Sequence, residues 1–138
     1  SSQSALSLIT ETGDFKRFAN AQQYASFLGL VPGEDSSGED QTRLGITKAG
    51  NRHLRTLLVE AAQGYSRGQI GHKSKELKKR QEGNPPEVIA YADKANERLR
   101  RRYYRMVLAS NKRTNVAKTA VARELACFIW GMLTGNIA

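Results

Sequence analysis

The hydrophobic and polar positions of the chain repeat mostly with the period of an α-helix. The pattern is clearest after Asn51, where apolar residues recur three or four positions apart: Leu54, Leu57, Leu58, Ala61, Ala62 and Tyr65. This spacing gathers them on one face of a helix, and Asn51 is a suitable cap for its start. We expect this helix to end near Gly68 or Gly71.

Two longer segments carry the same period. Residues 87–110 form one apolar stripe, made of Val88, Ala92, Ala95, Leu99, Tyr103 and Met106. Residues 114–133 form another, made of Ala117, Val121, Leu125, Phe128 and Met132. Both patterns predict a helix with one buried face. The stretch ACFIWGML is apolar nearly all round, so we expect that end to be buried in the core or in a partner.

Two short helices are predicted near the start of the chain. The first covers residues 2–13 and ends near Gly13. The second covers residues 20–30, with Asn20 as its N-cap and Gly29 as its stop.

The remaining stretches read as connections. A glycine-rich loop runs from Gly33 to Asn51, and only its 42–48 region is a candidate strand. Residues 72–86 are basic and end in two prolines, which predicts a solvated connection. The pattern as a whole predicts an all-α fold. We expect one compact helical domain over residues 1–138, with the long glycine-rich loop between the second and third helices.

The charge balance indicates a polyanionic partner. The chain has 22 lysines and arginines against 13 acidic residues, a net charge of +9. Such an excess favours nucleic acid or an anionic membrane surface. No apolar run is long enough to cross a bilayer, and the first residues lack the charged start of a signal peptide. We therefore expect a cytoplasmic protein with no membrane partner.

Cysteine and histidine usage limits the other chemistries. The single cysteine, Cys127, excludes an internal disulfide and suits a reducing compartment. Only His53 and His72 could join it at a zinc ion, so we expect no metal site in this chain. The sequence begins almost directly in a predicted helix and ends in one. We therefore expect an excised domain, whose natural protein extends in the amino-terminal direction.

The loop before residue 51 has the character of an anion-binding turn. GITKAG matches the first part of a P-loop, but Asn51 and Arg52 stand where lysine and serine or threonine should follow, which excludes a nucleoside triphosphatase. A glycine-rich turn that feeds a helix start can still hold a phosphate. The basic residues placed to assist are Arg43, Lys48, Arg52 and Arg55. The alternative is that Gly50 and Asn51 only shape and cap the helix.

Physical chemistry alone does not select a nucleophile in this loop. Neither Ser36 nor Ser37 lies in a Gly-x-Ser-x-Gly elbow, and a hydroxyl needs activation by a base, a metal or a positive neighbour. His53 is a possible base, but its place in the predicted helix fits a structural or surface role equally well. The four acids around the serines show no calcium-loop spacing and are read as solvated: Glu34, Asp35, Glu39 and Asp40.

The helix predicted over residues 87–110 carries a second group of cations. Helical geometry brings four of them together on the side away from the apolar stripe: Lys94, Arg98, Arg101 and Arg105. Arg100 and Arg102 lie beside them. The forked donors of arginine suit phosphates, although a solvated helix face is the alternative. Of the nearby tyrosines, Tyr91 and Tyr104 could stack on bases, whereas Tyr103 is expected in the core.

Three stretches together resemble a family of bacterial transposases. They are GDFKRF…YASFLGLVP, SSG…GITKAGN and ARELACFIW, which follow in this order over nearly the whole chain. They are similar to the carboxy-terminal domain of insertion-sequence recombinases whose amino-terminal domain is RuvC-like with a DEDD set of acids. Piv-type DNA invertases are related to these proteins. Each stretch alone is weak, whereas their combination is specific.

The resemblance implies an RNA-guided DNA recombinase. In that family a bridge RNA pairs with donor and target DNA, and the RuvC-like acids bind magnesium. A serine of the carboxy-terminal domain attacks the DNA phosphate and forms a phosphoserine link. That serine directly precedes the loop glycine, a position that Ser37 occupies here, with Ser36 as its rival. The residues then expected near the scissile phosphate are Arg43, Lys48 and Asn51.

The RuvC-like half is absent from this sequence, and the expected magnesium site with it. The resemblance implies four partners: DNA, guide RNA, the RuvC-like domain of the same protein and further copies in a homo-oligomer. We expect the chain alone to bind nucleic acid without recombining DNA. Two other functions stay open. One is a non-catalytic helical DNA- or RNA-binding and oligomerisation module, and the other is a protein-interaction domain that docks through Phe128, Ile129 and Trp130.

Overall fold

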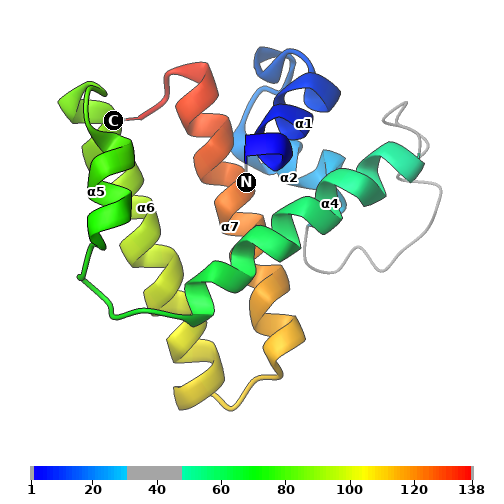
Figure 1. The fold of residues 1–138 in the computed structure, drawn as a ribbon. Helices are drawn as coiled ribbons and strands as arrows, with labels where there is room; N and C mark the ends of the chain where they lie inside the picture. The colour runs from blue at the N-terminus through cyan, green and yellow to red at the C-terminus, as the bar shows by residue number, and fades with distance from the viewer. Residues whose placement is uncertain (1, 31–47, 138) are drawn as a thin grey trace.

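Figure 1 shows the fold in a computed structural model, which describes the backbone of residues 2–30 and 48–137 and the side chains of residues 3–30 and 52–137. All regular structure in this part of the chain is helical, as predicted. The main helices are α1 (Ser2–Thr12), α2 (Ala21–Phe27), α4 (Lys48–Ala62), α5 (Lys75–Gln81), α6 (Pro86–Tyr104) and α7 (Thr114–Thr134). The part of the glycine-rich loop before Lys48, with nearly all of its candidate strand, lies outside the described residues.

The last helix, α7, is the centre of the domain. It packs against α2, α4 and α6, and Figure 1 shows it between α6 on one side and α1 and α2 on the other. Its buried positions are small or β-branched: Ala117, Ala120, Val121, Ala122 and Ala126. Small side chains allow neighbouring helices to approach closely, so larger residues from those helices fill the space between them.

An aromatic cluster anchors the start of the chain to this centre. The rings of Phe15 and Phe18 lie 5.0 and 5.2 Å from that of Tyr24, and Phe27 packs on Phe18. The Tyr24 hydroxyl is buried and lies 3.0 Å from the Thr12 hydroxyl, so its polar atom has a partner. Helix α2 begins as predicted, because the Asn20 side chain accepts a hydrogen bond from the Gln23 amide.

Helix α4 differs from the prediction at both ends. It begins at Lys48, so Asn51 lies inside the helix and the prediction that it caps the start is wrong. Lys48 and Ala49 are good helix formers, and the helix starts with them although Gly50, which follows, is unfavourable inside a helix. The α-helix ends at Ala62 and continues as a 3₁₀ turn, Gln63–Ser66. Gly68 and Gly71 follow in the turn beyond it, both with positive φ.

The basic segment over residues 72–86 is a further correction. It contains α5 and is therefore not a plain connection. Ser74 caps this helix, since its side chain accepts a hydrogen bond from the Leu77 amide at 3.2 Å. Lys73 ties the segment to α6, because its ammonium group lies 2.7 Å from an Asp93 carboxylate oxygen.

The two long helices follow the prediction. Helix α6 begins with Pro86 at its first turn and continues past Tyr104 into a π-helical turn, Arg105–Ala109. Its predicted stripe faces inward: Ala95, Leu99 and Tyr103 are buried and Val88, Ala92 and Met106 are half-buried. The apolar end of α7 packs on the core, with Phe128, Ile129 and Trp130 half-buried against it. The Trp130 indole donates a hydrogen bond to the Phe18 carbonyl.

Candidate nucleic-acid interface

The apolar stripe of α6 faces the core, so basic residues of this helix lie along its border with α7. Seven residues line a cleft of about 390 Å³ there: Lys94, Glu97, Arg98, Arg101, Arg102, Arg105 and Glu124. All four cations predicted to lie together on α6 are among them. The cleft holds five cations and two carboxylates, so it carries an excess of three positive charges.

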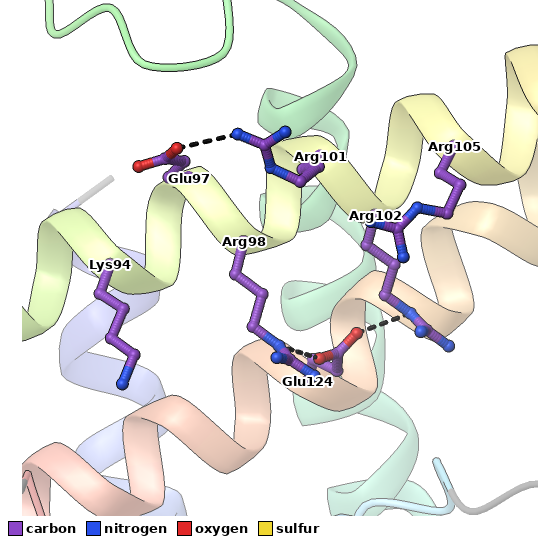
Figure 2. A pocket seen from close by; sticks show the side chains of 7 residues that line it. All are labelled: Lys94, Glu97, Arg98, Arg101, Arg102, Arg105 and Glu124. Atoms are coloured by element: carbon purple, nitrogen blue, oxygen red, sulfur yellow. Dashed lines mark hydrogen bonds and ion pairs between the residues drawn. The ribbon is translucent and has the colours of Figure 1, made fainter.

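A single carboxylate on α7 joins two of the arginines. Arg98 Nε donates a hydrogen bond to Glu124 Oε1 at 2.8 Å, and Arg102 Nε lies 2.6 Å from Glu124 Oε2. The second contact is a close ion pair without hydrogen-bond alignment. Figure 2 shows both side chains reaching from successive turns of α6 to Glu124. The Glu124 side chain is 18% exposed, whereas that of Arg98 is 64% exposed.

The other cations of the cleft differ in how freely they can accept a ligand. Arg101 points away from Glu124, and its guanidinium lies 2.9 Å from the Glu97 carboxylate (Figure 2). Both side chains of this pair are exposed, so the ion pair contributes little free energy in water. The side chains of Lys94 and Arg105 are exposed and make no hydrogen bond or ion pair with the described residues. They therefore keep their full charge for a partner.

Arg52 and Arg55, two of the basic residues predicted around the start of α4, do not line this cleft. Figure 1 shows that α4 begins away from α6 and approaches it only at its end. Arg52 is exposed, whereas Arg55 donates a hydrogen bond to the Leu28 carbonyl at 3.4 Å. Lys48 and Asn51 lie in α4, but their side chains are outside the described residues. Ser36, Ser37 and Arg43 are outside them altogether.

The segment that leaves α2 is held by two arginines. Besides the Arg55 contact to Leu28, Arg123 Nε donates a hydrogen bond to the Leu30 carbonyl. Burial lowers the pKa of the Arg123 guanidinium, and the neighbouring Arg102 lowers it further. Leu28 and Leu30 are themselves buried in the core. Arg55 was expected to contact nucleic acid, but one of its N–H donors is used in a contact within the fold.

The tyrosines considered as base-stacking platforms are used inside the fold. Tyr103 is buried, as expected. Tyr91 is half-buried, donates a hydrogen bond to the Phe128 carbonyl at 2.9 Å and packs on the Phe128 ring. Tyr104 is also half-buried and donates to the Gly68 carbonyl. The described residues near the cleft therefore offer charge and hydrogen-bond donors for a backbone phosphate rather than rings for bases.

Two further sequence candidates have structural partners. The His53 ring lies 2.9 Å from the Glu11 carboxylate, a contact that joins α4 to α1. Arg100, expected beside the basic group, turns away from the cleft and donates to the Arg67 carbonyl. Over the described ranges, no three His, Cys, Asp or Glu side chains gather as a metal site would require. The acids expected to be solvated, Glu34 to Asp40, lie outside those ranges.

Cys127 is free and half-buried. Burial raises the pKa of its thiol, and the carboxylate of Glu124 raises it further. The thiol therefore stays protonated near neutral pH, which makes it a poor nucleophile. In the described part of the chain, no helix is both long enough and apolar enough to span a membrane.

The sequence reading missed Glu124, which organises the cleft. Its signal was present, since Glu124 is the only acidic residue between Thr114 and Thr134, and α7 packs against a strongly basic helix. An isolated acid in that setting predicts an ion pair. Periodicity could not name its partners, because Arg98 and Arg102 lie more than twenty positions earlier in the chain.

Comparison with known proteins places the chain in a family. Residues 1–78, which include α1, α2 and α4, match the family described as Transposase IS116/IS110/IS902. "Putative transposase y4qE" of Sinorhizobium fredii is 46% identical over 128 residues, which cover 93% of this chain and 32% of that protein. The transposase for insertion sequence element IS1111A of Coxiella burnetii is 44% identical over 63 residues, which cover 46% of this chain and 17% of that protein.

No solved structure gives a significant match. The chain spans about a third or less of the length of these two relatives. The family match extends over more than half of the chain and includes the first two of the three stretches quoted from the sequence. The chain belongs to the IS116/IS110/IS902 family of transposases.

Proposed function

We propose that this domain holds DNA or RNA for its transposase by gripping the phosphate backbone in the cleft between α6 and α7. The observation that carries the proposal is the excess of three positive charges among the seven residues that line this cleft. Arginine presents several donors in one plane, which fits a phosphodiester better than a point charge does. Such contacts position a nucleic acid without reading its bases.

Charge removal tests this binding role. The variant Arg98→Ala, Arg101→Ala, Arg105→Ala removes three cations from the cleft. Its matched control, Lys75→Ala, Lys78→Ala, Lys79→Ala, removes three exposed cations from α5 and changes the net charge equally. Fluorescence anisotropy with a labelled duplex DNA and a labelled RNA hairpin should show a loss of roughly tenfold or more for the first variant and a smaller loss for the control. Equal losses would mean that binding depends on net charge alone.

We further propose that this domain supplies a serine nucleophile to the complete transposase. The resemblance supports Ser37, and Ser36 is the alternative. The Ser37 oxygen attacks the phosphorus of the scissile phosphodiester and loses its proton. The bond from phosphorus to one sugar oxygen breaks, and that oxygen leaves as a hydroxyl after gaining a proton. The phosphoserine link conserves one phosphodiester, so a second sugar hydroxyl can displace the serine and reseal the strand.

The remaining parts of this reaction come from elsewhere in the proposed assembly. We assign magnesium binding to a RuvC-like domain, target choice to a guide RNA and completion of the active site to a homo-oligomer. Arg43, Lys48 and Asn51 are assigned to the scissile phosphate. The described side chains offer no ligand cluster for magnesium, so no step is assigned to the metal in this chain.

A covalent adduct tests the serine. The complete transposase would be incubated with magnesium, its RNA and a nicked trapping DNA, and then denatured. Wild type and Ser36→Ala should both give a protein–DNA adduct that survives denaturation, whereas Ser37→Ala should give none. An adduct lost only in Ser36→Ala moves the nucleophile by one residue. Tight binding without an adduct in any protein favours the non-catalytic binding module instead.

A further inference from the structure

The arrangement around Glu124 is more specific than a basic surface. Both oxygens of one carboxylate are used, each by the Nε atom of a different arginine. Arg98 and Arg102 lie one helical turn apart on α6, and Glu124 reaches them from α7. The carboxylate is largely covered, while the Arg98 and Arg102 side chains are 64% and 37% exposed.

This contact leaves the outer donors of both guanidinium groups available. A guanidinium has five N–H donors, and the Nε–H carries only one of them. With Nε of each arginine placed against the Glu124 carboxylate, the terminal nitrogens remain for a ligand in the cleft. No hydrogen bond joins these terminal nitrogens to the described residues. The forked N–H donors of a guanidinium group can bind phosphate oxygens bidentately.

We propose that Glu124 is a positioning residue, which holds Arg98 and Arg102 so that both bind the same backbone phosphodiester. This inference rests on the proposed nucleic-acid function of the cleft and adds the place where one phosphate lies. A free arginine side chain samples many rotamers and loses that freedom when it binds. Glu124 imposes the order in advance, so less conformational entropy is lost on binding.

Neutralising Glu124 should weaken the binding of nucleic acid. Glu124 is an anion in a site for an anion, and Coulomb's law alone would have its removal tighten binding. Positioning has the opposite effect, because the two guanidinium groups lose their shared anchor. The side chain of Gln keeps the size of Glu, but its amide nitrogen cannot accept a hydrogen bond. Glu124→Gln therefore separates positioning from simple neutralisation.

Glu97 offers a matched control for the charge change. It lines the same cleft, but its partner is Arg101 on the exposed side of α6. Glu97→Gln adds the same unit of net positive charge without disturbing Arg98 or Arg102. We expect Glu97→Gln to bind a labelled duplex DNA about twofold more tightly and Glu124→Gln to bind it about tenfold more weakly.

Two further variants keep the test decisive. Glu124→Asp retains the charge but is one methylene shorter, so it should not reach both arginines and should also weaken binding. In an Arg98→Ala, Arg102→Ala background, Glu124→Gln should change affinity by less than about twofold, because nothing is left to position. Circular dichroism establishes that each variant keeps the helical content of wild type.

These measurements test the positioning role of Glu124 separately from nucleic-acid binding in the cleft. Wild-type binding that the Arg98→Ala, Arg102→Ala pair does not weaken overturns both. If that pair weakens binding while Glu124→Gln binds as tightly as wild type or more tightly, the nucleic-acid function stands and the positioning role is overturned. Wild-type affinity in Glu124→Asp overturns it equally. We expect both Glu124 variants to bind more weakly than wild type. In the Arg98→Ala, Arg102→Ala background, we expect Glu124→Gln to have almost no effect.

Discussion

The close approach of α6 and α7 depends on a glycine, and a single methyl group tests it. Gly131 is buried in α7, and a Cβ added there would lie 2.2 Å from the Tyr91 hydroxyl oxygen and 3.3 Å from the Cζ atom. This oxygen moves only with the ring, and the hydroxyl is further held by the hydrogen bond that it donates to the Phe128 carbonyl at 2.9 Å. Gly131→Ala must therefore displace the Tyr91 ring or separate the helices.

The expected cost combines opposing effects. Overpacking of this kind destabilises by about 1–3 kcal/mol. A lost hydrogen bond adds about 1 kcal/mol. Alanine is favoured over glycine inside a helix by about 1 kcal/mol, and Gly131 has no positive φ that would oppose the exchange. We expect a net loss of about 1–3 kcal/mol in the free energy of unfolding.

A double-mutant cycle with Tyr91→Phe isolates the contact. Without the hydroxyl oxygen, the nearest atoms to the new Cβ are the Asn136 carbonyl oxygen at 3.0 Å and the ring Cζ at 3.3 Å. The cost of Gly131→Ala should then fall by about 1–2 kcal/mol. Urea unfolding followed by circular dichroism measures all four proteins. An equal cost in both backgrounds, or a stabilised Gly131→Ala single variant, would refute the proposed clash.

Three further predictions concern single polar contacts. Burial alone would raise the pKa of Asp93, but hydrogen bonds from Lys73 and Gln81 and the charge of Lys73 hold it below its usual value. Its contribution to stability is thus present above about pH 4 and lost as the pH falls through the lower folded pKa, so Asp93→Asn should lose stability near neutrality and converge with wild type in acid. Burial raises the pKa of Tyr24 to about 12. The stability gained by keeping this phenol protonated is present below about pH 10 and lost as the pH rises towards the folded value, and an alkaline unfolding series of Tyr24→Phe should lack this loss. Asn20→Ala should cost about 1 kcal/mol in urea unfolding, because the Gln23 amide loses its acceptor.

Local signals in the sequence were sufficient for most of the helical framework. The apolar stripe of α6 and the Asn20 cap follow from periodicity and capping chemistry, which depend on neighbouring residues. Helix α5 was missed because its single partly buried apolar residue, Leu77, is surrounded by charges. The Asn51 cap failed because α4 extends back to Lys48, through Gly50, although glycine is a poor helix former. Cap and breaker signals indicate where a helix can end, and packing decides among them.

In the candidate site, too, features within one helix could be predicted from the sequence, whereas contacts between distant segments could not. Periodicity brought the four predicted cations together correctly, since Arg105 begins the π-helical turn that continues α6 and the others lie in α6 itself. The Glu97–Arg101 pair is an i,i+4 contact that the spacing along one helix already indicates, whereas the anchor on Glu124 depends on which side chains meet in space. The hydroxyls of Tyr91 and Tyr104 likewise find carbonyls more than thirty positions away. The assignment of Ser37 rests on family resemblance, and its position lies outside the described residues.

The most direct test of the account is to locate the nucleic acid on the domain. A titration of the ¹⁵N-labelled chain with a short duplex DNA would follow the backbone amides and the Nε signals of the arginines by NMR. We predict saturable shifts along α6 from Lys94 to Arg105 and at Glu124, with the Arg98 and Arg102 Nε signals among the most affected. Shifts confined to α5, with the α6–α7 cleft unchanged, would contradict the account.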